Sequence, residues 1–391
     1  MESCSATLAP KTSIVKNESE GTMAERIRRQ HTVSKFYLKG FADQSGGIRR
    51  VSLPGEPSIV LSIRDASVIK DFYTVTLPDG SLSDAFERAF GKIEGAAAEA
   101  LSDILAGVWP IEGEAREAFA TWVALQHLRS QDVRYSQGYM NAEMIRLIVG
   151  VSGKEALRSL IQNSESRPVS DEELDDEWRD ITKPGGPDMA PSANQHVRLL
   201  SSLLPPTAAY LRDCHWTLFR FDRRSIATSD HPVTLVVAPD HPQWQGVGIA
   251  TAELFLIPLS HRVALTIQPR RRFPQLPKGI DRVPDFTKKG TTAIARSINQ
   301  ETAARALQYV YHHPNETPLQ GLYLPKPETR DRPSVSNAGA LIREEGLFSE
   351  MTEEARRAIS ASSVPDESSS GMSIDDIPWP IPGRRSKTSD R

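Results

Sequence analysis

The stretch Ala115–Arg129, AREAFATWVALQHLR, decides how the centre of this chain folds. At about 3.6 residues per turn, Phe119 and Trp122 lie on one helical face, and Gln126 and Arg129 continue that face. The buried side of the predicted helix therefore ends in an amide and a guanidinium. A buried polar group without a partner costs roughly 1 to 3 kcal/mol and a buried charge costs more, so an acidic group must meet them.

The preceding segment supplies a candidate for that acidic group. Residues 83–106 predict a helix, and Glu94 lies at the edge of its apolar stripe. The stripe consists of Phe86, Phe90, Ile93, Ala97, Leu101 and Ile104. A hairpin that turns over Gly107–Ile111 brings Glu94 towards Gln126 or Arg129. The resulting pair is either part of a functional site or an ion pair that fixes the packing of two helices.

Composition and charge narrow the class of protein. The 391 residues are 39% hydrophobic and 25% charged, which suffices for one large domain or two smaller ones. A net charge of -3 provides no overall attraction to nucleic acid or to an anionic membrane. No apolar run approaches the roughly 20 residues that span a bilayer. The cysteines, Cys4 and Cys214, form no disulfide framework, so we expect a cytoplasmic protein with no membrane partner.

The ordered part of the chain divides into three zones of secondary structure. Strand-like runs at residues 59–61 and 72–75 predict a small N-terminal β region. A central helical body follows, with helices expected at residues 83–106, 112–130, 136–150, 153–163 and 191–213. The acidic run Asp171–Asp180 is interpreted as a solvated face or loop.

Strands return in the third zone. They are expected at residues 216–221, 225–228, 233–237, 252–257 and 262–268, and a closing helix at 292–311. Because the strands are grouped apart from the helices, the sequence predicts an α+β fold with an antiparallel or mixed C-terminal β-sheet.

The domain organisation follows from composition. Residues 1–22 and 362–391 are polar and show no periodic apolar pattern, so we expect disordered tails. A single α+β domain is expected at 23–330 and a peripheral helical or loop extension at 331–361. The proline-rich run Ile377–Pro382 either docks on a protein partner or serves as a spacer.

His31 is the first candidate for chemistry. It opens a segment dense in apolar residues, which includes Phe36, Tyr37, Leu38 and Phe41. An imidazole has an ordinary pKa of about 6.5, so His31 suits a general base or a metal ligand. The alternative is a hydrogen-bonded structural histidine in a buried segment.

Asp230 is the second candidate, in Thr228-Ser229-Asp230-His231-Pro232 between two predicted strands. Asp230, alone or with His231, is either a carboxylate facing a cleft or part of a turn with an Asx-type hydrogen bond. The tripeptide recurs at Asp240-His241-Pro242, which shows how readily turns produce the pattern.

Several catalytic motifs do not occur in the sequence. There is no phosphate-binding loop, no His-Glu-x-x-His, no Cys-x-x-Cys, no Gly-x-Ser-x-Gly and no dinucleotide-binding glycine fingerprint. No cofactor is therefore assigned, and the metal requirement is left open. The basic groups in Pro269–Phe273, together with Arg220, Arg223 and Arg224, either contact phosphates or form solvated strand edges.

Short motifs spaced along the chain resemble those of a known family. They are Gln30-His31-x-Val33-x-x-x-Tyr37-Leu38-x-x-Phe41, Ile93-Glu94, Ala124-Leu125-Gln126-x-x-Arg129, Thr228-Ser229-Asp230-x-Pro232, Pro258-Leu259-Ser260 and Ile298-Asn299. In this order the chain resembles a bacterial member of domain of unknown function 4238, over roughly residues 30–313. The resemblance implies no established activity, substrate or cofactor. It indicates only the extent of the fold and the positions of candidate site residues.

The resemblance and the periodicity agree on five polar residues: His31, Glu94, Gln126, Arg129 and Asp230. Asn299 also matches, but an Asn just before Gln300-Glu301 is well explained as a helix N-cap, so we expect a structural role.

Two hypotheses for function follow. In the first, the protein is an intracellular hydrolase acting on an anionic or phosphate-containing small molecule or nucleic acid, for example as a nuclease-like phosphodiesterase. Glu94 or Asp230 then serves as base or metal ligand, and His31 as ligand or acid–base group. Gln126 and Arg129 bind the substrate. In the second, the protein is a non-catalytic binding module, and these residues form a buried packing network.

Overall fold

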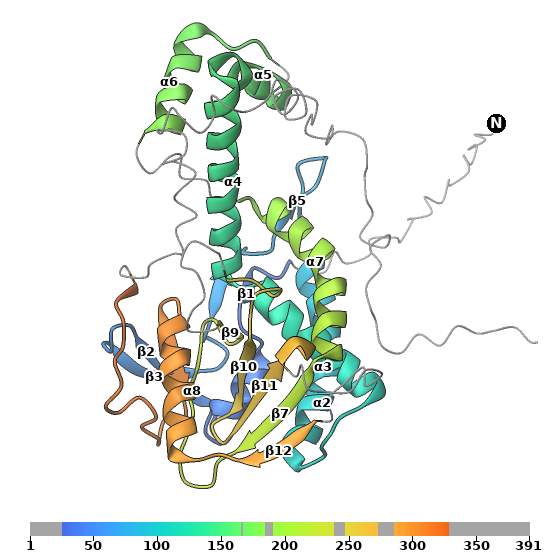
Figure 1. Ribbon diagram of the computed structural model, residues 1–391, viewed down its shortest axis with the longest axis vertical. Helices are drawn as coiled ribbons and strands as arrows, with labels where there is room; N and C mark the ends of the chain where they lie inside the picture. The colour runs from blue at the N-terminus through green and yellow to red at the C-terminus, as the bar shows by residue number, and fades with distance from the viewer. Residues whose placement is uncertain (1–25, 166, 184–190, 238–246, 273–284, 328–391) are drawn as a thin grey trace, which may run out of the picture.

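The computed structural model describes residues 26–165, 167–183, 191–237, 247–272 and 285–327. Figure 1 shows a body of sheets and helices, from which one long helix rises and carries two shorter ones. The expected tails at 1–22 and 362–391, the extension at 331–361, Ile377–Pro382 and Asp240-His241-Pro242 lie outside the described residues.

Three helices form the core of the body. They are α2 (Ala85–Ala106), α3 (Gly113–Leu128) and α7 (Ala193–Asp213), and α3 packs against both of the others. Phe119 and Trp122 of α3 are fully buried. Gly107 ends α2 with a φ of 109°, a left-handed conformation that favours glycine. The predicted hairpin of two helices is therefore confirmed.

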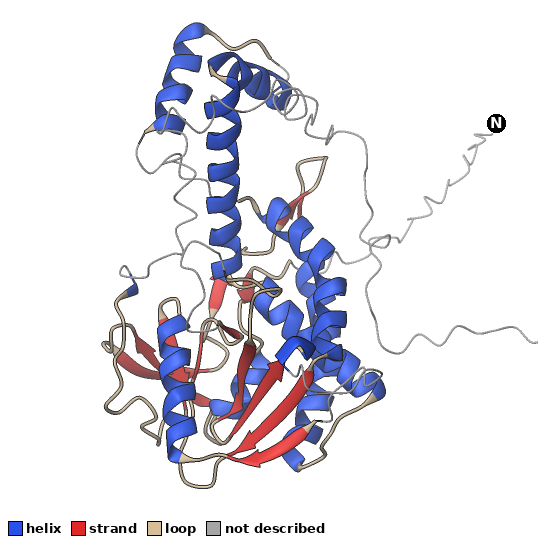
Figure 2. Ribbon diagram, viewed as in Figure 1, coloured by secondary structure: helices blue, strands red, loops and turns tan. Residues whose placement is uncertain are grey.

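The larger β-sheet has five strands. In spatial order they are β12 (Phe286–Lys289), β7 (His215–Arg220), β11 (Val263–Gln268), β10 (Leu254–Ser260) and β9 (Thr234–Val236). The pairs are antiparallel except for β12 and β7, which run parallel. The C-terminal sheet is thus mixed, and the α+β class is confirmed (Figure 2).

A second sheet joins the two ends of the described chain. Its order is β3 (Ser58–Ser62), β2 (Gly47–Ser52), β13 (Tyr309–His312) and β8 (Thr228–Ser229). The N-terminal β region is therefore completed by C-terminal strands. Two short pairs accompany it, β1 (Arg29–His31) with β4 (Val68–Lys70) and β5 (Val75–Thr76) with β6 (Leu82–Ser83). The predicted strand at 72–75 was wrong except at its last residue.

The closing helix is shorter than predicted. α8 (Thr292–Arg305) ends before β13, because the backbone of Tyr309–His312 pairs with β2 and β8. Thr291 is the N-cap of α8, so the interpretation of Asn299 as an N-cap was wrong. Asn299 is buried inside the helix and has a structural role: its Oδ1 accepts from the Ala227 N–H at 2.8 Å. Its Nδ2 donates to the carbonyls of Ser225 and Pro318.

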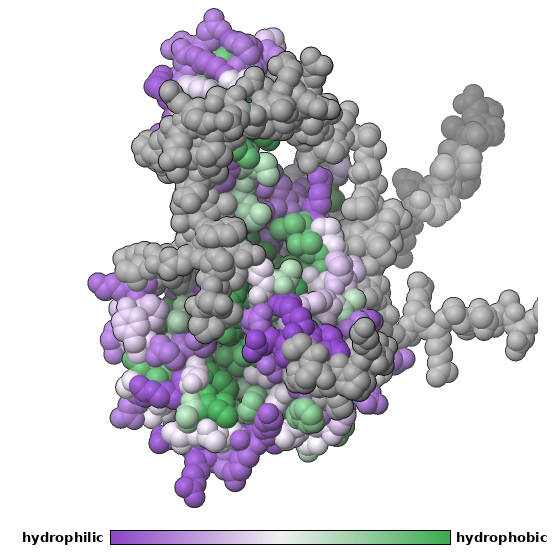
Figure 3. Space-filling model, in the orientation of Figure 1, coloured by the Kyte–Doolittle hydropathy of each residue, from purple (hydrophilic) through white to green (hydrophobic). Residues whose placement is uncertain are grey.

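The arm consists of α4 (Gln131–Ser152), α5 (Lys154–Glu165) and α6 (Asp171–Thr182). Val149, Leu157, Leu174 and Ile181 form a small core of its own. The acidic run is a helix rather than a loop, because Ser170 caps it and Leu174 anchors it. Its outer surface is hydrophilic, as expected (Figure 3).

Among the described residues no helix is both long enough and apolar enough to cross a membrane. The short helix α1 (Lys35–Leu38) lies between the body's helices and the larger sheet. Its Tyr37 hydroxyl donates to the Pro258 carbonyl at 2.6 Å and lies 2.6 Å from the Thr228 hydroxyl. These contacts fix the N-terminal segment against both sheets.

Replacing Asn299 by Ala tests the structural role of this side chain. Because the substitution leaves two buried backbone groups and the half-buried Pro318 carbonyl without their partner, we expect a loss of about 2 to 4 kcal/mol in the free energy of unfolding, measured by urea denaturation. Gln300→Ala is the matched control, since its side chain makes one exposed hydrogen bond to the Tyr323 carbonyl. Equal midpoints for the two variants would contradict this assignment.

Candidate functional site

Arg129 forms the centre of a buried polar network. It follows the last residue of α3, and its side chain is 1% exposed. Its Nη1 donates to Glu94 Oε1 at 2.8 Å. Its Nη2 donates to Ser34 Oγ at 2.7 Å and to Gln126 Oε1 at 2.9 Å. The sequence predicted that Glu94 lies towards Gln126 or Arg129, and in the structure it bonds to Arg129.

Ser34 connects the N-terminal segment to this network. Its Oγ lies 2.8 Å from Glu94 Oε1, to which it donates, and accepts from Trp122 Nε1 at 2.8 Å. Its N–H donates to Gln126 Oε1, while Gln126 Nε2 donates to the Thr32 carbonyl. The sequence analysis did not single out Ser34, although a small polar residue between Val33 and the apolar run that follows is a usable signal.

Gln126 and Arg129, the two residues that the sequence predicted to bind substrate, use their polar groups for bonds within the protein. The amide of Gln126 and both terminal nitrogens of Arg129 bond to protein groups. Burial alone lowers the pKa of Arg129, but Glu94 and neighbouring acidic groups outweigh it, so the pKa rises and the guanidinium stays charged. These residues hold α2, α3 and residues 32–34 together.

A titratable shell, His31, Glu87 and Glu94, borders this network on its more exposed side. Glu87 and Glu94 are seven residues apart on α2, two turns along one face. The Glu94 side chain is 24% exposed, and His31 and Glu87 are half-buried. His31 Nε2 and Glu87 Oε2 are buried atoms with no hydrogen-bond partner among the described residues. Glu87 was missed by the sequence analysis, but its spacing from Glu94 is a signal for it.

The protein environment shifts the pKa values of Glu87 and His31 in opposite directions. Burial raises the pKa of Glu87 to about 7, and the charge of Arg129 opposes part of that shift. Burial lowers the pKa of His31, with a smaller lowering from Lys35, while its hydrogen bond to the Arg64 backbone and the charge of Glu94 oppose it. Near neutral pH, His31 is a neutral imidazole, and Glu87 populates both protonation states. This combination suits general acid–base chemistry.

Asp230 is engaged at a different place. Its Oδ1 accepts from the Leu307 N–H at 2.6 Å, and its Oδ2 accepts from the N–H groups of Gln308 and Tyr309 at 2.7 and 3.0 Å. The carboxylate thus holds the connection between α8 and β13. The local turn bond comes from Ser229, whose Oγ accepts from the His231 N–H. The structure therefore brings His31, Glu94, Gln126 and Arg129 together, whereas these bonds tie Asp230 to the α8–β13 connection.

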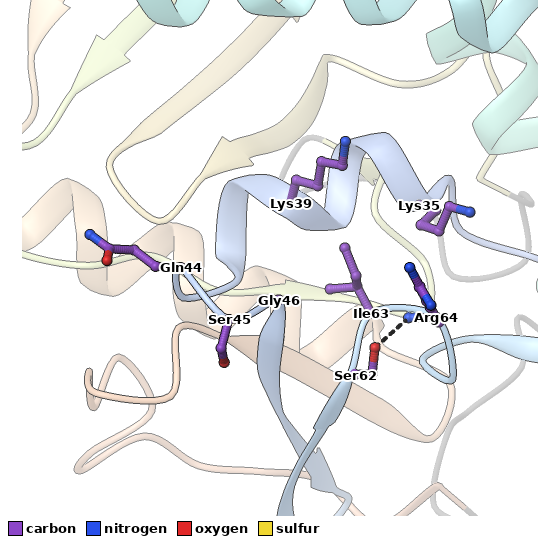
Figure 4. A pocket seen from close by; sticks show the side chains of 8 residues that line it. All are labelled: Lys35, Lys39, Gln44, Ser45, Gly46, Ser62, Ile63 and Arg64. Carbon is purple, nitrogen blue, oxygen red and sulfur yellow. Dashed lines mark hydrogen bonds between the residues drawn. The ribbon is translucent and has the colours of Figure 1, made fainter.

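A basic pocket lies between α1 and the turn after β3 (Figure 4), and two of its lining residues, Lys35 and Arg64, interact with His31. It has a volume of about 590 Å³ and is lined by Lys35, Lys39, Gln44, Ser45, Gly46, Ser62, Ile63 and Arg64. The signal for it in the sequence is the basic segment 26–39, which contains five Arg or Lys residues and no Asp or Glu.

Three of the other basic residues that were candidates for phosphate contacts have partners in the protein. Arg271 and Arg272 pair with Glu253, and Arg220 Nη2 donates to the Ile104 carbonyl. Among the described residues, no group of three or more His, Cys, Asp or Glu side chains is arranged to hold a metal ion.

Removing Arg129 tests the role of the network in folding. Because Arg129→Ala leaves the Glu94 carboxylate without its cation, we expect a destabilisation of about 3 to 5 kcal/mol in chemical denaturation. Arg179→Ala is the control, since it removes only an exposed ion pair with Asp176 and should leave the midpoint nearly unchanged. A stable Arg129→Ala variant would show that the network does not hold the helices together.

The raised pKa of Glu87 predicts a pH dependence of stability. Its pKa rises from 4.5 to about 7 on folding, so the native state binds the extra proton between these values. Stability contributed by the protonated form is present at pH 4.5 and is lost as the pH rises to 7. We therefore expect Glu87→Gln to raise the melting temperature relative to the unmodified chain at pH 8 but hardly at pH 5. The exposed Glu99→Gln on the same helix should show no such difference.

Comparisons with known proteins support the family resemblance. No curated protein and no solved structure matches the chain. The family described as "Protein of unknown function (DUF4238)" matches residues 29–316, which include His31, Glu87, Glu94, Arg129 and the basic pocket. The match covers well over half of the 391 residues, and the chain therefore belongs to the DUF4238 family.

Proposed function

We propose that this protein is a hydrolase that acts on an anionic, phosphate-containing substrate, with His31 and Glu87 as its acid–base pair. The observation that carries the proposal is the pair of buried, unpartnered atoms, His31 Nε2 and Glu87 Oε2, beside an ionic network. Other buried atoms of the described residues also lack a partner, among them Arg129 Nε. These two, however, belong to titratable groups from separate segments that have shifted pKa values and border the same Glu94–Arg129 pair, which favours a ligand there.

The roles follow from charge and surroundings. Neutral His31 accepts the proton of an attacking water, and protonated Glu87 donates a proton to the leaving-group oxygen. Glu94 is fixed by Arg129 and Ser34, and its charge favours the imidazolium that forms when His31 takes up the proton. Arg129 acts by positioning Glu94 rather than by holding substrate. Asp230 has no part in this proposal because its carboxylate binds the α8–β13 connection.

A second candidate function is a non-catalytic binding module. It is favoured by the burial of Gln126 and Arg129, whose bonds are all made within the protein and would serve packing alone. In that case His31 and Glu87 affect ligand affinity, and no bond of the ligand is broken.

The test is a hydrolysis screen of the full-length protein at pH 7 on aryl phosphomonoesters, aryl phosphodiesters and short oligonucleotides, with and without Mg²⁺ or Mn²⁺. We expect turnover of at least one class, and a fall in kcat of roughly 100-fold or more in His31→Gln and in Glu87→Gln. Glu99→Gln on the same helix is the matched control. Circular dichroism at the assay temperature confirms that each variant is folded.

Two results would contradict the hydrolase. One is the lack of turnover of every substrate class by the unmodified chain. The other is a folded His31→Gln variant that keeps the full rate. Binding of a phosphate compound without turnover would instead favour the second candidate.

A further inference from the structure

We infer that the basic pocket formed by Lys35, Lys39 and Arg64 binds the phosphate group of the substrate. This deepens the proposed function, because it names the substrate class and places its anionic group beside His31. The binding step itself rests on the pocket alone.

Among the described residues, some basic residues near the pocket pair with carboxylates, whereas those that line the pocket do not. Three neighbouring arginines have carboxylate partners: Arg26 and Arg28 pair with Asp71, and Arg29 pairs with Asp65. In contrast, the side chains of Lys35, Lys39 and Arg64 make no ion pair within the described part of the chain. Unpaired cations gathered around one hollow create a local positive potential that attracts an anion.

The two sides of the pocket supply different kinds of cation. Figure 4 shows Lys35 and Lys39 on the helical segment and Arg64 on the turn after β3, with Ile63 between them. Lysine provides a compact point charge on a flexible stem, whereas the arginine fork can make two parallel bonds to one phosphate. Both kinds of group bind phosphate, and they line the same hollow from two sides.

Hydroxyl groups and a glycine complete the lining. The Ser62 Oγ accepts from the Arg64 N–H at 3.2 Å and is free to donate its own hydrogen to an anion. Gly46 has a φ of 79° and no atom within 4 Å of the place of a Cβ, so the wall there is open. The nearby carboxylate, Asp43, is turned to its own loop, where it accepts from Ser45 Oγ and from the Gly47 N–H.

His31 connects this pocket to the acid–base pair. It precedes Lys35 by four residues, and Lys35 lies close enough to lower the pKa of the imidazole. The backbone of Arg64 also bonds to the His31 ring. Lys35 and Arg64 thus connect the pocket, which His31 itself does not line, to the imidazole that would activate water.

The experiment measures binding separately from turnover. Full-length protein is titrated with inorganic phosphate and with pyrophosphate by isothermal calorimetry, at low and high salt. We expect binding that weakens as salt rises, and an affinity about tenfold lower in each of Lys35→Gln, Lys39→Gln and Arg64→Gln. The triple variant should lose measurable binding. Arg29→Gln, which removes a paired cation nearby, and Lys288→Gln in the other sheet are the controls.

Two results would overturn the pocket: no binding of either probe, or a triple variant with unchanged affinity. If phosphate binds, titrations with a mononucleotide and with a single-stranded oligonucleotide show whether the pocket takes a terminal phosphate or a phosphodiester backbone. Phosphate binding that persists in His31→Gln, while turnover is lost, supports both the pocket and the hydrolase. Phosphate binding by a chain without any turnover supports the pocket and overturns the hydrolase.

Discussion

The buried guanidinium of Arg129 is the constraint on which the rest of the structure depends. A charge in the core must be paired and hydrogen-bonded, and Arg129 meets this need with groups from three segments: Glu94 of α2, Gln126 of α3 and Ser34 before α1. The helical hairpin and the N-terminal segment are thereby locked together. Because Tyr37 lies three residues beyond Ser34 and bonds to Pro258 and Thr228, the same constraint orients the segment against both sheets.

The polar groups inside the Arg129 network differ from those at its border in how they are bonded. Inside it, both terminal nitrogens of Arg129 have acceptors, whereas its buried Nε has none among the described residues. At its border, His31 and Glu87 keep buried atoms without partners, and the pocket cations lie beyond them. A single stretch from His31 to Lys39 thus spans the proposed acid–base group, the network serine and two cations. The rigidity supplied by the network is what would hold these groups in register.

The sequence predicted the helical hairpin well because helical periodicity is a local property that packing strengthens. It predicted α6 and β13 poorly. The acidic run became a helix because its apolar residues Leu174 and Ile181 dock on the core of the arm. The end of the closing helix became a strand because β2 and β8 offered open edges. Both outcomes depend on distant segments. Asp230 illustrates the same limit: its position in a turn was evident, but its bonds to residues 307–309 were not.

The sequence by itself determined that Gln126 and Arg129 are buried and that an acidic group must meet them, because a helix of known period fixes which side chains share a face. It also determined that Glu94 is within reach, since a short turn joins the two helices. Only the tertiary structure decided which polar groups keep unpaired atoms. Packing between segments far apart in the chain decides that Arg29 has a carboxylate partner and Arg64 has none in the described residues. The same packing buries Glu87 enough to raise its pKa to about 7.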